Sequence, residues 1–255
     1  MRPSQHLALV LLVCPALALT PGAQTNDETE IRAIIEEIDQ LYRSESSYSE
    51  LEMEVVTPHW QRTLAMEAWS LGLDRTFIRI TSPKKERGVA TLRVESEMWN
   101  YLPKTDKVIK IPPSMMMSSW MGSDFTNDDL VKEFSLFEDY TYEFVTVEAP
   151  DDNLIYINCI PREDLPVVWG NVVIAARRGD HLPVWQKYYD EKGALVRVLH
   201  YRDIREMGGR TLPAVMEMVP QRKEGHRTLI RYTRVEFDAQ FEEEIFSLRH
   251  LRSQR

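Results

Sequence analysis

The residues that could carry out catalysis are scattered along the chain without a recognisable spacing. Beyond the first 23 residues the histidines share no metal-ligand spacing; they are His59, His181, His200, His226 and His250. The motifs of a serine nucleophile elbow, a zinc-binding helix, a P-loop and a dinucleotide-binding turn are missing. The 40 Asp and Glu residues give no specific support to a glycosidase-type carboxylate pair. We therefore expect no catalytic residues, no metal and no cofactor.

One group of oxygen-bearing side chains lies close together in the sequence, at Asp124, Asn127, Asp128 and Asp129. Oxygen ligands of this kind suit Ca²⁺, but their order differs from the D-x-D-x-D-G loop with its distant Glu. Thr126 and Asp129 have the spacing of a capping box, and acidic residues favour a helix N-terminus. We favour a helix start here over a metal site. Its apolar stripe would consist of Leu130, Val131, Phe134 and Phe137.

The segment before this helix uses apolar residues in a way that fits no strand. After Pro112 and Pro113 come six flexible or aromatic apolar side chains: Met115, Met116, Met117, Trp120, Met121 and Phe125. A regular strand cannot turn all of them toward one core, and methionine adapts to ligands of variable shape. The segment therefore predicts the lid and lining of an apolar binding site. Ordinary core that plugs one open end of a sheet is the alternative.

Aromatic residues on neighbouring predicted strands extend this hypothesis. Trp69, Trp99 and Tyr101 occupy the strand side opposite the more aliphatic side. If that side is also partly apolar, a curved sheet could hold a ligand in its concavity, with these three residues in its lining. The alternative is that they stabilise an otherwise thin sandwich.

The remaining pattern is mainly that of β-strands. Residues 28–42 have helical apolar spacing, residues 44–49 form a polar linker, and alternation with period 2 begins at residue 50. Strands are expected at 50–55, 64–71, 77–80, 89–102, 107–111, 140–147, 154–160, 167–176, 182–189, 194–201, 211–219 and 228–237. Short turns separate them, and a partly helical tail follows at 242–251. The fold class is mainly β (α+β), a single curved antiparallel sheet or open barrel.

The first 23 residues have the anatomy of a signal peptide. Arg2 precedes the short apolar run 7–19, and cleavage sites follow Ala18 or Ala23; an uncleaved anchor is the alternative. We expect a mature domain at 24–255. Cys14 would leave with the signal peptide, so Cys159 would remain as a buried, inert thiol. The net charge of -9 with no basic stripe argues against a nucleic-acid partner.

A family resemblance rests on most of these features together. The signal peptide, the amphipathic helix, the long meander, and above all the run from Trp120 to Leu130 resemble periplasmic outer-membrane lipoprotein-sorting proteins of LolA-like fold. The resemblance implies a half-open antiparallel β-barrel covered by helices. It also implies a concave apolar surface that binds acyl chains of lipoproteins or other lipids and shields them from water.

The resemblance leads to one main functional hypothesis and two others. The main one is a periplasmic carrier, without catalysis, that moves lipid or lipoprotein acyl chains toward the outer membrane. An inner-membrane transporter complex and an outer-membrane acceptor would be its partners. The first alternative is a sensor or accessory module that binds a membrane-protein partner through the same fold. The second is a hydrolase of envelope glycans or lipids.

Overall fold

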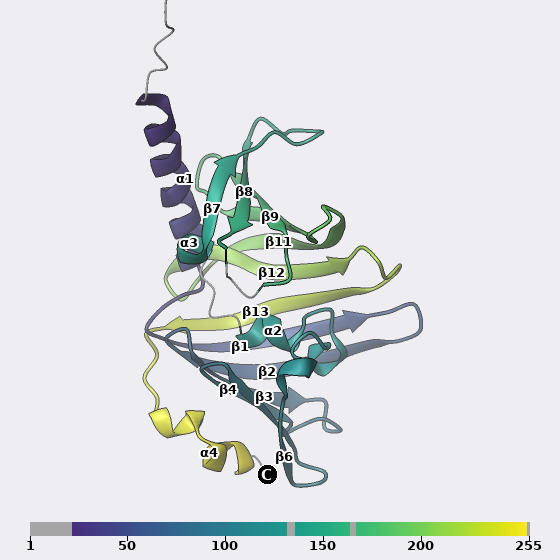
Figure 1. Ribbon diagram of the computed structural model, residues 1–255. Helices are drawn as coiled ribbons and strands as arrows, with labels where there is room; N and C mark the ends of the chain where they lie inside the picture. The colour runs from purple at the N-terminus through teal and green to yellow at the C-terminus, as the bar shows by residue number, and fades with distance from the viewer. Residues whose placement is uncertain (1–21, 132–135, 164–166, 254–255) are drawn as a thin grey trace, which may run out of the picture.

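The computed structural model describes residues 22–131, 136–163 and 167–253. Within these residues, 13 strands form one antiparallel sheet in the order β6-β5-β4-β3-β2-β1-β13-β12-β11-β10-β9-β8-β7. The sheet is curved and open, with few helices (Figure 1). The predicted fold class, a mainly β chain with a curved antiparallel sheet, is therefore confirmed. Apart from its last two residues, the expected signal peptide lies outside the described range.

The first half of the sheet is a meander of six strands. They are β1 (Ser46–Val56), β2 (Gln61–Leu71), β3 (Arg75–Ser82), β4 (Ala90–Val94), β5 (Glu97–Leu102) and β6 (Lys107–Lys110). The expected polar linker at 44–49 was partly wrong, because β1 already begins at Ser46. The expected single strand at 89–102 was also wrong. It is the hairpin β4–β5, in which Glu95 takes a positive φ of 54° that glycine usually supplies.

The second half is a meander of seven strands. They are β7 (Tyr140–Phe144), β8 (Leu154–Pro161), β9 (Asn171–Arg177), β10 (Pro183–Tyr189), β11 (Leu195–Met207), β12 (Arg210–Pro220) and β13 (Arg227–Phe237). Each expected strand of this half exists, with shifted ends. The two meanders are joined by antiparallel pairing of β1 with β13, from Ser47 opposite Phe237 to Val56 opposite Arg227, and we call this pairing the seam.

Short helices and one long helix complete the described chain. They are α1 (Gly22–Gln40), η1 (Pro113–Met115), η2 (Trp120–Gly122), α2 (Asn127–Val131), α3 (Leu136–Asp139), η3 (Glu243–Phe246) and α4 (Leu248–Arg252). The apolar stripe of α1 is confirmed, since Ile31, Ile34, Ile35 and Ile38 are buried against β8 and β9. In the chain, α1 belongs to the first half, yet it covers strands of the second (Figure 1).

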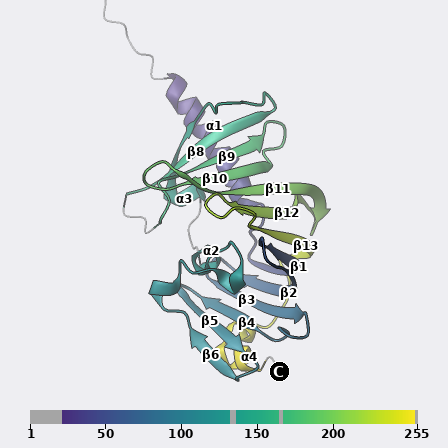
Figure 2. The same ribbon diagram turned by 90° about the vertical axis from the view of Figure 1, so that its right-hand side faces the viewer.

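The strand order dictates what happens between β6 and β7. These strands are consecutive in the chain but form the two opposite edges of the sheet. The connection between them must therefore span the sheet from edge to edge. We call residues 112–131 of this connection the lid. Figure 2 shows α2, the last part of the lid, beside the middle strands of the sheet.

The sheet carries apolar side chains on both faces. We call inner the face that bears Leu51, Met53 and Met66, which pack with Trp120 of the lid. The outer face bears Phe77 and Leu92. On the outer face, the C-terminal segment 241–251 forms the cover, through buried Phe246 and Leu251 among others. In the first half of the sheet, apolar clusters on the two faces are thus covered by different segments of the chain.

Candidate functional site

The lid is fastened to the inner face by hydrogen bonds to strands of the first half and to the seam strand β13. Arg62 of β2 donates to the Met121 carbonyl, Trp120 Nε1 donates to Thr91 Oγ1 of β4 (3.2 Å), and the Asp124 N–H donates to Thr228 Oγ1 of β13 (2.9 Å). The Thr228 hydroxyl donates in turn to Asp124 Oδ2 (2.8 Å). The lid therefore lies over the part of the inner face that runs from β4 to β13.

A buried ion pair fastens the end of the lid to the second half of the sheet. Arg197 of β11 donates two hydrogen bonds to the carboxylate of Asp129 in α2, at 2.6 and 2.7 Å. Its guanidinium lies over the rings of Trp169 and Tyr188, 4.4 and 4.5 Å from their centroids. Burial lowers the pKa of Arg197, but the hydrogen bonds and charge of Asp129 outweigh burial and raise it. Arg197 therefore keeps its charge.

The predicted capping box is confirmed. The Thr126 N–H donates to Asp129 Oδ2 (2.8 Å), and the Asp129 N–H donates to Thr126 Oγ1 (3.1 Å). One carboxylate thus caps α2 and binds Arg197. Of the expected apolar stripe, Phe134 lies outside the described residues. Among the described side chains, no group of three or more His, Cys, Asp or Glu residues is arranged to hold a metal ion.

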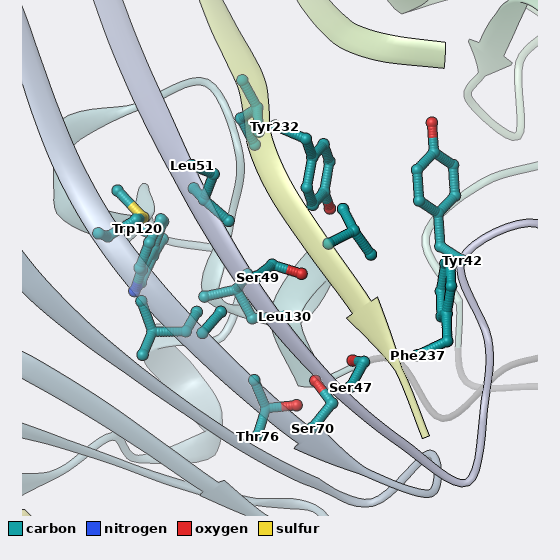
Figure 3. Close-up of a pocket in the computed structure, with 15 residues that line it drawn as sticks. Tyr42, Ser47, Ser49, Leu51, Ser70, Thr76, Trp120, Leu130, Tyr232 and Phe237 are labelled. Atoms are coloured by element: carbon teal, nitrogen blue, oxygen red, sulfur yellow. The ribbon is translucent and has the colours of Figure 1, made fainter. Parts of the chain in front are cut away.

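Between the lid and the inner face lies a hollow of about 200 Å³ (Figure 3). Much of its wall is apolar and comes from several strands and from the lid: Leu51, Met66, Ile78, Trp120, Leu130 and Ile230. The remaining wall includes four serine and threonine side chains, Ser47, Ser49, Ser70 and Thr76. We call this space the lid hollow. Its shape and lining suit an apolar ligand with a small polar group.

A second hollow, of about 400 Å³, lies beside the C-terminal end of α1 and is lined in part by Ile38, Leu41 and Tyr140. We call it the helix hollow. Tyr42 lines both hollows. Its ring stacks on Tyr232 at 5.6 Å between centroids, and its hydroxyl donates to the Pro213 carbonyl at 2.5 Å. The Tyr42 side chain therefore forms part of the wall between the lid hollow and the helix hollow.

The structure brings only part of the predicted lid set into the lid hollow. Trp120 lines it directly, and Met121 packs against the same apolar cluster. Phe125 and Met116 are half-buried in the lid. Met115 and Met117 are exposed, so they face solvent in this closed arrangement.

The strand residues of the predicted set lie elsewhere. Trp69, Trp99 and Tyr101 belong to the apolar cluster of the outer face, where they pack with Phe246 and Leu251. The structure therefore separates them from Trp120 by the thickness of the sheet. Trp69 lies opposite the aliphatic side of β2, as predicted, but the hairpin β4–β5 brings Leu92 to the same face as Trp99 and Tyr101, so for these two the predicted opposition was wrong. The sequence pattern did not indicate that the C-terminal segment would cover the outer face.

The hydroxyl residues and Tyr42 were not among the predicted site residues. Ser47 and Ser49 fell in the expected linker at 44–49, although they continue the period-2 alternation of Leu51 and Met53 back toward the N-terminus. That alternation was the signal that could have found them. Cys159 is buried as expected, and burial raises the pKa of its thiol to about 12, which makes it unreactive.

A model of a family of uncharacterized proteins matches residues 72–253, which is more than half of the chain. The chain belongs to this DUF1329-like family. The match runs from the turn before β3 to α4, so it includes the lid and the C-terminal cover. A search of curated proteins gave no match to this DUF1329-like sequence. Among its described residues, no helix has the length and apolar character needed to cross a membrane.

Three solved structures resemble the DUF1329-like chain over nearly their whole length. A DUF1329 family protein from Desulfovibrio piger is 23% identical, with 88% of this chain and 99% of that chain covered and a TM-score of 0.77. A putative outer membrane lipoprotein-sorting protein domain from Vibrio parahaemolyticus is 21% identical, with 87% and 97% covered and a TM-score of 0.73. A LolA superfamily protein from Nitrosomonas europaea is 20% identical, with 86% and 98% covered and a TM-score of 0.70. The predicted LolA-like fold is therefore confirmed.

Proposed function

We propose that this DUF1329-like protein is a periplasmic carrier that binds acyl chains of lipoproteins or other lipids and moves them toward the outer membrane, without catalysis. The observation that carries the proposal is the lid hollow, an apolar space on the inner face that is roofed by a separate, weakly structured segment. The fold shared with a putative lipoprotein-sorting domain supports the class of cargo and the compartment. An inner-membrane donor complex and an outer-membrane acceptor would be the partners.

The size of the hollow bears on how cargo would be held. A cavity of about 150 Å³ holds a benzene molecule, so the lid hollow, at about 200 Å³, takes only a short stretch of acyl chain. Sites for larger ligands usually measure about 300 to 1,000 Å³. A whole acyl chain therefore requires the lid to move away from the sheet. Each methylene that is then buried contributes about 0.8 kcal/mol to binding.

The lid has the properties that such movement needs. Its helix α2 has only five residues, and its other described helices are single turns of 3-10 type. The lid is held at separate points, by the bonds of Trp120, Met121, Asp124 and Asp129 to the sheet. A carrier must release its cargo, and a roof fastened at few points can open without disturbing the strands beneath. Met115, Met116 and Met117 would then offer adaptable apolar contacts to an entering chain.

Binding of a fluorescent fatty acid, measured by titration, tests this proposal. We expect wild-type protein to bind the probe, and Trp120→Ala to weaken binding at least tenfold, because the indole forms part of the apolar wall. The matched control is Trp60→Ala, which removes an exposed indole in the turn between β1 and β2 and should leave the affinity unchanged.

Two results would contradict the proposal. One is a wild-type protein that binds neither the probe nor any lipid that native mass spectrometry detects after purification from its own periplasm. The other is a Trp120→Ala variant that remains folded and binds the probe as tightly as wild type, which would place the acyl site away from the lid hollow.

A further inference from the structure

Four hydroxyl side chains are grouped at one part of the lid hollow. Ser47 of β1 lies directly opposite Ser70 of β2, and Ser70 lies directly opposite Thr76 of β3. Ser49 follows on the same face of β1, one pleat further along the strand. Figure 3 shows Ser47, Ser70 and Thr76 gathered at one end of the hollow, with Ser49 between them and Trp120. We call these four residues the hydroxyl row.

The hydroxyl groups of this row form no hydrogen bonds to the described part of the protein. Among the described residues, none of the four has a hydrogen-bond partner for its side chain. Ser49 is only 8% exposed, and it lines the hollow. By contrast Thr91, also on the inner face, bonds to both Asn100 and Trp120. Because these hydroxyls line the hollow and form no bond within the described part of the protein, they are available to donate to and accept from a polar group that enters it.

The other residues that line the lid hollow indicate whether the polar group of the ligand is charged. Among the described residues that line the lid hollow, none is Asp, Glu, Lys, Arg or His. A carboxylate or phosphate placed there would lose its hydration without gaining a cation, which is strongly unfavourable. Hydroxyl groups both donate and accept, so they can satisfy an uncharged group that carries carbonyl and hydroxyl oxygens together.

We propose that the hydroxyl row is a subsite for the uncharged, ester-linked glyceryl group of an acylglycerol, whose acyl chain extends toward Trp120. The inference rests on the proposed carrier function and names the class of ligand for the same site. It predicts that the protein distinguishes ligands of equal chain length by the charge and oxygens of their polar end. Hydrocarbon burial alone would not make this distinction.

Titration calorimetry with monomyristoylglycerol and with myristate at pH 8 tests the subsite. We expect the wild-type protein to bind the glycerol ester at least tenfold more tightly than the carboxylate. The variant Ser47→Ala/Ser70→Ala/Thr76→Val keeps the size of each side chain close to the original but removes three hydroxyls. At about fivefold per lost hydrogen bond, it should bind the glycerol ester at least tenfold more weakly.

Two controls separate loss of the subsite from loss of the hollow or the fold. The uncharged probe N-phenyl-1-naphthylamine should bind the triple variant as it binds wild type. The variant Thr63→Val/Ser96→Ala, which removes hydroxyls from exposed positions, should bind the glycerol ester like wild type.

The outcomes distinguish this inference from the function on which it rests. If the triple variant keeps full affinity for the glycerol ester, or if wild type prefers myristate, the subsite is wrong while the carrier function stands. If wild type binds neither lipid nor probe, the carrier function fails and the subsite fails with it.

Discussion

Arg197 shows how a buried charged side chain is stabilised where the lid meets the sheet. Only 6% of its side chain is exposed, and its charge is balanced by a bidentate bond to Asp129 and by two aromatic rings. Removing one partner of a buried pair leaves the other without compensation, which is far more damaging than losing an exposed pair. Arg197 therefore links the stability of the fold to the closure of the lid.

The substitution Arg197→Met tests this link. It leaves the Asp129 carboxylate buried without its guanidinium, so we expect the free energy of unfolding to fall by about 3 kcal/mol. Urea denaturation followed by circular dichroism would measure it. The matched control is Arg205→Met on the same strand, whose ion pair with Asp203 is exposed and should contribute little. Equal effects of the two substitutions would argue against a buried fastening.

Single residues also show where sequence reasoning about the site succeeded. Trp120 was predicted as lining because its segment had apolar residues without strand periodicity, and it lines the lid hollow. Ser70 and Thr76 were not predicted, because a polar residue on a strand usually indicates the solvent side. Only the pairing of three strands shows that these hydroxyls converge, and pairing is not visible in one sequence.

At the scale of elements, sequence patterns predicted correctly those helices that a regular apolar spacing or a capping box specifies. The helix α1 and the start of α2 follow from apolar spacing and from the Thr126 capping box. The hairpin β4–β5 was missed, because a two-residue turn without glycine leaves the alternation of residues 89–102 unbroken. The C-terminal cover was expected as a partly helical tail, but its target on the outer face depends on contacts distant in sequence.

The C-terminal cover yields a prediction at this scale. Leu251 of α4 is 0% exposed and packs in the outer-face cluster, so Leu251→Ala should lower the free energy of unfolding by about 3 kcal/mol. Leu248 in the same short helix is 41% exposed, and Leu248→Ala should cost much less. Thermal or urea unfolding of both variants provides the measurement. A small effect of Leu251→Ala would show that the segment is dispensable for stability.

At the scale of the whole molecule, the strand count and antiparallel meander could be predicted because consecutive strands pair with each other. The seam between β1 and β13 could not, since it joins strands about 180 positions apart in the chain. The seam determines the architecture. It turns two separate meanders into one continuous sheet and leaves β6 and β7 as its free edges.

Because of this arrangement, we expect the two halves to stay associated even when the chain between them is cut. A break after Met117 would give one piece with α1 and β1–β6 and another with β7–β13. These pieces would still be joined along the seam and by α1, which rests on strands of the opposite piece. We expect fragments 24–117 and 118–255, expressed together, to copurify by affinity capture of one tagged fragment. A fragment recovered alone would show that the unbroken backbone is essential. Reassembly would show that the seam and α1 together hold the two halves without a continuous backbone.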